Sequence, residues 1–99
     1  MSVFSKRLKE ARLRKGLSQE QLGIEAGLDP MSASTRMNRY ELAKRTPDFS
    51  LIERFAEVLE VPTAYLFAQD DELAKLINLY EKLNNTERAK VIKELLGRD

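Results

Sequence analysis

The chain has 99 residues, the length of one domain or of one domain with a short appendix, and 42% of them are hydrophobic, enough for a buried core. It contains no cysteine and no histidine, which excludes disulfides, thiolate catalysis and cysteine-ligated zinc and removes the commonest general base. The net charge of +1 hides an asymmetry, because residues 1–47 carry ten Lys/Arg against five Asp/Glu (+5) and residues 48–99 carry seven against eleven (−4). Such a split suggests a nucleic-acid-binding surface on the first half.

Helical periodicity begins near the N-terminus. Phe4, Leu8 and Ala11 follow the i, i+4, i+7 spacing of one helix face and predict a helix over residues 3–15. Gly16 is expected to end it in the left-handed conformation. The other face is basic and is interpreted as solvated: Lys6, Arg7, Lys9, Arg14 and Lys15.

A second helix is predicted from its capping residues. Ser18 stands at an N-cap position and Gln21 at the reciprocal N3 position of a capping box. Together they predict a helix over residues 19–26, which Gly27 closes.

A third helix is expected to start at Asp29-Pro30, because aspartate is a favoured N-cap and proline a favoured first helical residue. We expect it to run to about Ala43. Its inward stripe is predicted to contain Ala33, Met37 and either Tyr40 or Glu41.

Two further helices complete the first part of the chain. Asp48 is placed to cap a helix over residues 49–60, and Pro62 separates it from a short helix over residues 63–67. The aromatic residues Tyr65 and Phe67 of the short helix are predicted to lie in the core.

The tail carries two more amphipathic patterns, a helix over residues 71–83 after a polar hinge and a helix over residues 86–96 capped by Asn85. Helices of this size do not form a core of their own, so they must pack on the first domain, on a second copy or on another protein. We interpret their apolar stripe as a dimerisation surface, with packing inside the chain as the alternative: Leu73, Leu76, Ile77, Tyr80, Leu83, Ile92 and Leu95.

Residues 17–41 therefore hold two short helices joined by a turn, a pair that can place its second helix in the DNA major groove. That second helix bears Arg36 and Arg39, which suit guanine, and Asn38, which suits adenine. The alternative is that both arginines are surface charges that only keep the protein soluble. The adjoining basic pair Lys44-Arg45 suits phosphate contact.

Five segments then resemble one known family in order: Leu17-Ser18-Gln19-Glu20-Gln21-Leu22, Ala26-Gly27-Leu28, Arg39-Tyr40-Glu41, Lys44-Arg45-Thr46-Pro47 and the stretch from Phe55 to Phe67. Over about residues 4–67 the sequence resembles the Cro/C1-type (XRE family) helix-turn-helix domain. This resemblance implies a five-helix, lambda-repressor-like domain that binds operator DNA as a dimer.

The resemblance also implies roles for single residues. It places Gln19 at a phosphate-contacting position and implies a buried ion pair between Arg12 and Glu41. It matches Ser34, Thr35 and Arg39 to base-reading positions. With the residues that suit bases by their chemistry, the predicted base readers are Ser34, Thr35, Arg36, Asn38 and Arg39, and the predicted phosphate contacts are Gln19, Lys44, Arg45 and Thr46.

The sequence departs from the family pattern twice. About four additional residues separate Leu28 from Met37, so Ser32 and Arg36 could enter the base-contacting set. Glu41 is followed by Leu42-Ala43 instead of a glycine, so the recognition helix is expected to run a turn longer.

The sequence thus predicts an all-α protein with a helix-turn-helix domain over residues 1–68 and a two-helix extension over residues 69–99. The predicted function is a sequence-specific transcriptional regulator, a dimeric repressor that binds double-stranded DNA at an inverted-repeat operator. The alternative is an antitoxin-like module whose last helices bind a partner protein; an enzyme would need converging carboxylates that the sequence does not offer. We expect a cytoplasmic protein with no cofactor, no metal and no membrane segment.

Overall fold

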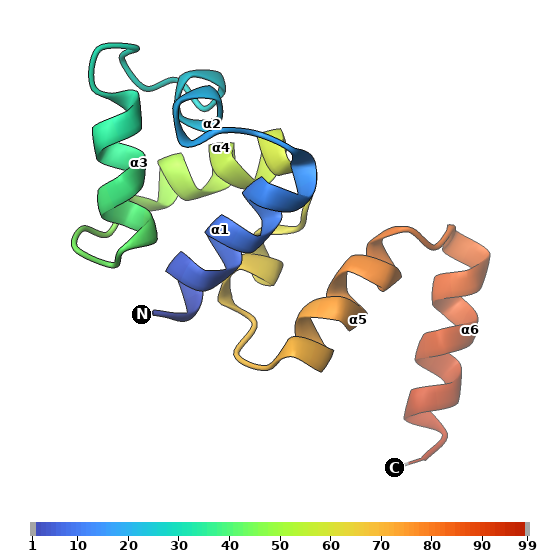
Figure 1. Cartoon of the computed structure of the whole chain (residues 1–99). Coiled ribbons are helices and arrows are strands. Elements are labelled where there is room, and N and C mark those ends of the chain that lie inside the picture. Colours follow the sequence, from blue (N-terminus) through green and yellow to red (C-terminus); the bar gives the residue numbers. More distant parts are fainter. Residues whose placement is uncertain (1, 99) are drawn as a thin grey trace.

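The structure is a computed structural model that describes residues 2–98, and these residues form helices and connecting turns without a strand. The elements are α1 (Val3–Lys15), α2 (Gln19–Glu25), α3 (Ala33–Glu41), α4 (Phe49–Leu59), the 3₁₀ helix η1 (Thr63–Phe67), α5 (Asp71–Glu81) and α6 (Asn85–Leu96). Figure 1 shows α1 at the centre of the first five elements, with α3 outermost on one side and α6 on the other. The predicted all-α fold is therefore confirmed.

Local sequence signals fix most helix ends. Ser18 and Gln21 form the predicted capping box, and Asp48 accepts a hydrogen bond from the Leu51 amide at 2.8 Å. Gly16 ends α1 with φ of 77°, a left-handed conformation that glycine adopts without steric cost. These ends depend on neighbouring residues alone, which explains why the sequence predicts them well.

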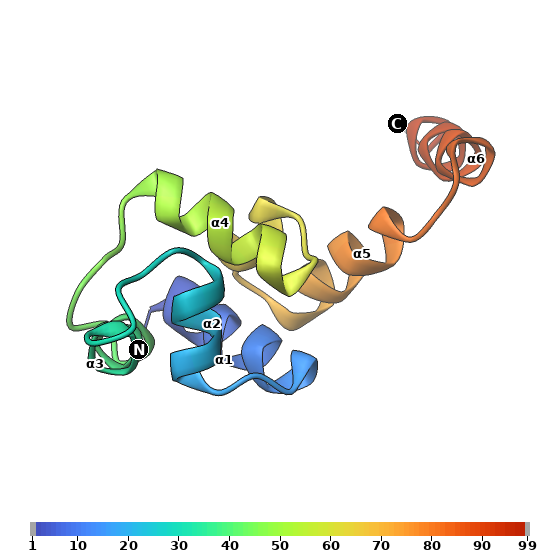
Figure 2. The same ribbon diagram turned by 90° about the horizontal axis from the view of Figure 1, so that it is seen from above.

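One core holds α1 to α4 and η1 together. Residues that are completely buried come from each of these elements, for example Leu8, Leu22, Met37, Phe55 and Leu66. The ring of Tyr40 on α3 packs edge-on against that of Phe55 on α4, with centroids 6.1 Å apart. As Figure 2 shows from above, α3 lies at the end of this bundle and keeps one long face free.

The third helix is shorter than predicted at both ends. It starts at Ala33, because the Asp29 carboxylate accepts from the Met31 amide at 2.8 Å in a tight turn and does not cap a helix. It ends at Glu41, and Ala43 adopts φ of 60° where the family pattern has a glycine. The expectation of a longer recognition helix is therefore wrong, and the additional residues form a turn.

Two smaller predictions also need correction. The last helix is capped by Asn84, which forms a capping box with Glu87, and not by Asn85, which is already helical. Phe67 is 47% exposed and stacks at 5.8 Å on the ring of Phe4 at the edge of the domain, whereas Tyr65 is buried as predicted. Tyr65 donates from its hydroxyl to Glu10 at 2.6 Å, and desolvation followed by this hydrogen bond raises the pKa of the tyrosine.

The tail helices differ in how they attach. Helix α5 packs against η1 and buries Ala74, while no residue of α6 is buried. The chain is consequently elongated, 52 × 25 × 22 Å, with a radius of gyration of 15.3 Å. A compact domain of this length would have about 13 Å. None of the helices is long and apolar enough to span a membrane within the described residues.

The joint between the domain and the tail is built on Arg7, which the sequence analysis placed on a solvated face. Arg7 is only 1% exposed; its Nε donates to the Ala68 carbonyl at 3.0 Å and its Nη1 to Asp71 at 2.9 Å. The hydrogen bond from Arg7, together with one from Lys6, holds the pKa of the Asp71 carboxyl below its ordinary value. The prediction that Arg7 is solvated is wrong because helical periodicity identifies faces of apolar residues. An arginine that is buried along its aliphatic stem still counts as polar in such a pattern.

Candidate DNA-binding surface

The crossing of α2 and α3 is unusually close and depends on Gly23. A β-carbon at this position would lie 3.0 Å from both the Ala33 β-carbon and the Met37 γ-carbon. Glycine therefore suits this crossing, because a side chain here would press against Ala33 and Met37. This contact fixes the two helices as one rigid pair.

A buried ion pair ties α3 to α1. Arg12 donates from Nε to Glu41 Oε2 at 2.6 Å and from Nη2 to Oε1 at 3.0 Å, and its Nη1 donates to the Leu17 carbonyl at 2.9 Å. Both side chains are less than 10% exposed. The structure thus contains the ion pair that the family resemblance implies, with the two-pronged geometry that arginine and carboxylate favour.

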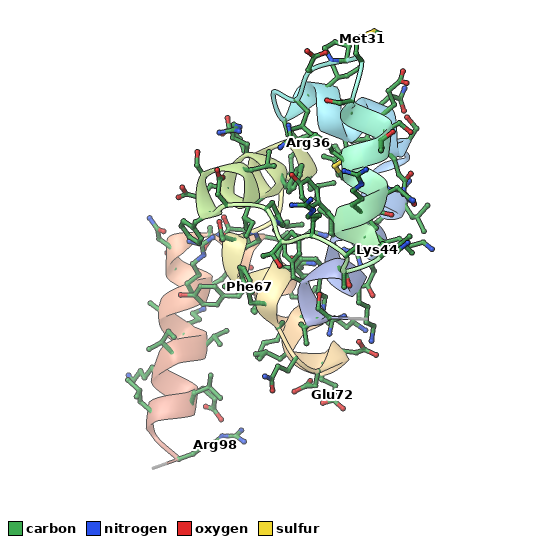
Figure 3. The ribbon with its side chains drawn as sticks, turned by 90° about the vertical axis from the view of Figure 1, so that its left-hand side faces the viewer. Met31, Arg36, Lys44, Phe67, Glu72 and Arg98 are labelled. Atoms are coloured by element: carbon green, nitrogen blue, oxygen red, sulfur yellow. The ribbon has the colours of Figure 1, made fainter. Side chains whose placement is uncertain are left out.

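The outward face of α3 is polar and carries no negative charge. Ser34, Thr35, Asn38 and Arg39 are exposed, while the only acid of the helix, Glu41, is buried against Arg12. Figure 3 views the molecule from this side, with Met31 and Lys44 at opposite ends of the helix. Four of the five predicted base-reading residues therefore lie on one accessible surface.

Arg36, the fifth residue, lies differently. Its side chain is half-buried, donates from Nη2 to the Tyr40 hydroxyl at 3.0 Å and lies 6.0 Å from the centre of that ring. It is therefore held along the flank of α3 that faces α4, and does not extend from the outward face.

The residues predicted to contact phosphate flank this face on two sides. Lys44, Arg45 and Thr46 are exposed in the loop that follows α3. Gln19, at the start of α2, donates from Nε2 to Glu41 at 3.2 Å and to Asn38 Oδ1 at 3.4 Å. In this structure Gln19 thus links the two helices and orients the Asn38 amide.

Sequence reasoning missed two apolar residues on this surface. Met31 is 93% exposed in the turn before α3, and Leu42 is half-exposed just after its end. Apolar side chains can contact the methyl group of thymine in the major groove. The sequence gave no signal for either residue, because neither belongs to the inward stripe that helical periodicity marks.

The predicted dimerisation stripe on the tail is only partly covered within one chain. Ile77 packs against the core, and Tyr80 and Leu83 are half-buried. The remaining residues of the stripe are exposed: Leu73, Leu76, Ile92 and Leu95. An open groove of about 650 Å³ lies between the end of α5 and α6. Its lining combines apolar residues such as Tyr80, Ala89 and Ile92 with the basic residues Arg88 and Lys93.

Helices α2 and α3 form a rigid pair, and the outward face of α3 is polar and free of acids. This arrangement defines a small helix-turn-helix protein. A family model of the helix-turn-helix domain matches residues 3–66, and the chain belongs to this family. Its structure is similar to a crystal structure of the transcriptional regulator BswR, with 41% sequence identity, 98% of this chain and 94% of that chain covered, and a TM-score of 0.88. A search of curated proteins gave no match. The chain is a DNA-binding transcriptional regulator, and the predicted XRE-type resemblance is consistent with both findings.

Proposed function

We propose that this protein is a transcriptional repressor that binds an inverted-repeat operator as a homodimer, with α3 of each copy in the major groove. The observation that carries the proposal is the acid-free outward face of α3, which lies beside a basic loop. DNA carries one negative charge per roughly 1.7 Å of its axis, so a helix face without carboxylates approaches the groove without electrostatic repulsion.

The proposal divides the surface into two roles. Ser34, Thr35, Asn38 and Arg39 contact base edges, since the side chains of these residue types can donate or accept hydrogen bonds there. Gln19, Lys44, Arg45 and Thr46 contact the phosphates on either side and set the register of the helix.

Selection from a random-sequence duplex library, followed by binding of the selected duplex at several salt concentrations, tests the DNA function. With Lys44 and Arg45 of both copies each neutralising one phosphate, the logarithm of the affinity should fall with the logarithm of salt with a slope of about −4. Asn38→Ala should reduce binding to the selected duplex and leave binding to random DNA unchanged. Failure to enrich any sequence, with no binding to random DNA either, would refute the proposal.

The dimer part of the proposal rests on α6. Helix α6 has 12 residues and no buried side chain, and its polar contacts to α5 come from Arg88. Isolated helices of this length are marginal in water. The apolar side of α6, which includes Ile92 and Leu95, therefore needs a cover. A second copy supplies an identical apolar stripe, and a two-fold dimer holds two recognition helices at the spacing of one DNA turn, about 34 Å.

Sedimentation of the full chain tests this part. We expect a dimer that the double variant Ile92→Gln/Leu95→Gln converts to a monomer, whereas Lys90→Gln/Glu94→Gln on the opposite side of the helix leaves it dimeric. If the wild-type protein is a monomer and α6 becomes helical only in a complex with another protein, the antitoxin-like alternative is favoured instead.

The repressor role has a separate test, since an activator would bind DNA with the same surface. In transcription in vitro from a promoter that contains the selected sequence, added protein should lower the amount of transcript. A rise in transcript at the same occupancy would make the protein an activator.

A further inference from the structure

A hollow of about 320 Å³ lies at the C-terminal end of α3. Its lining consists of Arg36, Arg39, Tyr40, Arg45 and Thr46, three guanidinium groups and two hydroxyl groups with no carboxylate among them. It opens beside the outward face of the recognition helix, at the junction between the helix and the basic loop.

The loop geometry creates this hollow. After α3 the chain turns back through Ala43, and the amides of Lys44 and Arg45 both donate to the Arg39 carbonyl, at 2.9 and 3.4 Å. This turn brings Arg45 beside the helix. It also satisfies carbonyl groups at the helix end, which would otherwise repel an anion there.

The three arginines are uncompensated. The ion pairs among the described residues involve Arg7, Arg12, Arg14 and other cations, but not Arg36, Arg39 or Arg45. Arg36 is fixed by its hydrogen bond to Tyr40, whose ring is anchored on Phe55 in the core. Three guanidinium groups therefore line one hollow without an acid, an arrangement that attracts an anion.

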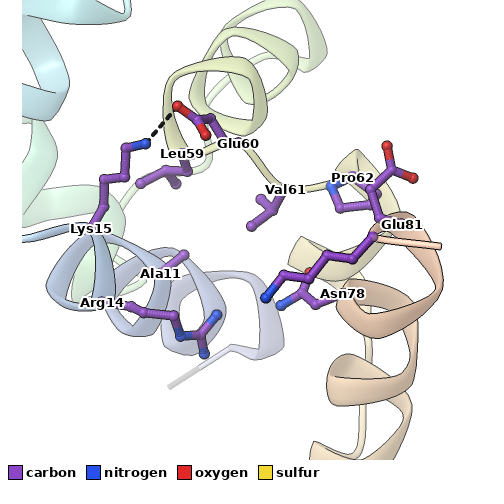
Figure 4. Close-up of a pocket in the computed structure, with 10 residues that line it drawn as sticks. Ala11, Arg14, Lys15, Leu59, Glu60, Val61, Pro62, Asn78 and Glu81 are labelled. Atoms are coloured by element: carbon purple, nitrogen blue, oxygen red, sulfur yellow. Dashed lines mark hydrogen bonds and ion pairs between the residues drawn. The ribbon is translucent and has the colours of Figure 1, made fainter. Parts of the chain in front are cut away.

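A second hollow shows the contrast. The cavity of about 220 Å³ between α1, the end of α4 and α5 also contains Arg14 and Lys15, but it is lined by Glu60 and Glu81 as well. There, Lys15 Nζ donates to Glu60 at 2.6 Å, as Figure 4 shows. That cavity therefore contains acids of the chain beside its cations, whereas the hollow at the end of α3 is lined by cations without an acid.

We propose that Arg36, Arg39, Arg45 and Thr46 form an oxyanion pocket that holds one phosphate of the DNA backbone. Planar guanidinium groups bind phosphate oxygens in pairs, and the Thr46 hydroxyl can donate a further hydrogen bond. The inference rests on the proposed function and changes it at one residue, because Arg39 now binds the backbone and does not read bases. Arg36, which had no role in the proposed function, binds the backbone beside it. Sequence selection is then left to Ser34, Thr35 and Asn38, together with the apolar Met31.

Comparison of the selected duplex with random-sequence DNA tests this assignment in the full-length protein. Arg36→Gln and Arg45→Gln should each weaken binding to both DNAs by the same factor, about ten-fold for the loss of one charge-assisted contact. The charge-matched control Lys75→Gln on α5 should weaken neither. Loss of binding to the selected duplex alone would make Arg36 a base reader and overturn the proposal. Melting temperatures establish that the variants are folded. If Arg36→Gln is unstable, the comparison is made with Arg45→Gln alone, because Arg45 is exposed in the loop.

A methylphosphonate scan of the selected duplex identifies the source of the phosphate, since each substitution removes the charge of one backbone position. One position in each half-site should weaken binding of the wild-type protein and have no further effect on Arg36→Gln. The absence of any such coupled position would overturn the proposal.

A last measurement separates the pocket from the proposed function. If the wild-type protein binds no DNA, titration with inorganic pyrophosphate, followed through the Nε–H signals of the arginines by NMR, still decides whether the pocket exists. Saturable shifts of the Nε–H signals of all three arginines would support the pocket and identify a free phosphate compound as its ligand. No shift would overturn the pocket itself.

Discussion

The buried ion pair between Arg12 and Glu41 offers a direct test of how α3 is held in place. Replacing Glu41 with alanine removes both oxygens that Arg12 contacts, at 2.6 and 3.0 Å, and leaves one hydrogen bond to the Leu17 carbonyl. The guanidinium is then a buried charge without a counter-ion. Gln19 loses its contact to the same carboxylate.

The cost follows from the desolvation of that charge. Removal of one partner of a buried ion pair destabilises proteins by about 3–5 kcal/mol. Domains of this size have a stability of about 5–15 kcal/mol, so Glu41→Ala should lower Tm by more than about 10 °C. The double variant Arg12→Met/Glu41→Leu removes both charges and fills the space with apolar atoms, and we expect it to recover most of the lost stability.

Urea denaturation followed by circular dichroism, at one fixed protein concentration, measures these free energies. The concentration must be fixed because dimerisation would add to the apparent stability. A loss below about 1 kcal/mol for Glu41→Ala would mean that the pair behaves as a surface ion pair, and the reasoning from burial would then be wrong. A double variant as unstable as Glu41→Ala would equally refute it.

Three further perturbations probe other parts of the structure. Gly23→Val should force α2 and α3 apart and cost about 1–3 kcal/mol in urea denaturation, with a loss of DNA binding; unchanged stability would contradict the close crossing. Ser18→Ala removes the cap of α2 and should cost about 1 kcal/mol in the same assay, while Ser50→Ala, outside the capping positions, should cost less. The carboxylate of Asp71 has a lowered pKa in the folded state, so its contribution to the unfolding free energy is present above its ordinary pKa of 3.8 and is lost as the pH falls through the lowered value. Asp71→Asn should therefore flatten the acid part of the stability–pH curve, and an identical curve for both proteins would exclude the ion pair with Arg7 in solution.

The helices that the sequence predicted best are those with complete local signals. The Ser18–Gln21 capping box and the Asp48 cap each satisfy backbone amides within three residues, so no distant part of the chain is needed to place them. Asp29 shows the limit of such signals. An aspartate stabilises a tight turn as well as it caps a helix, and in the structure Asp29 forms the turn while α3 starts at Ala33, which lies against Gly23.

The candidate site divides in the same way. The polar residues of α3 and the basic loop after it are evident from the sequence. The structure places Ser34, Thr35, Asn38 and Arg39 on one exposed face. The sequence does not distinguish Arg36 from Arg39. That difference depends on the Tyr40 hydroxyl, which in turn is positioned by Phe55 on another helix.

The sequence by itself determined that this chain is helical, that its basic charge belongs to the first half, and that a short helix pair carries DNA-reading residue types, because these properties follow from periodicity, capping and composition. The tertiary structure alone decided which cations are free. Arg7, which the sequence analysis placed on a solvated face, is buried against Asp71, while Arg36, Arg39 and Arg45 meet around one hollow without an acid. The reason is that ion pairing depends on distances between residues far apart in the chain, such as the 2.9 Å between Arg7 and Asp71, which no local pattern records.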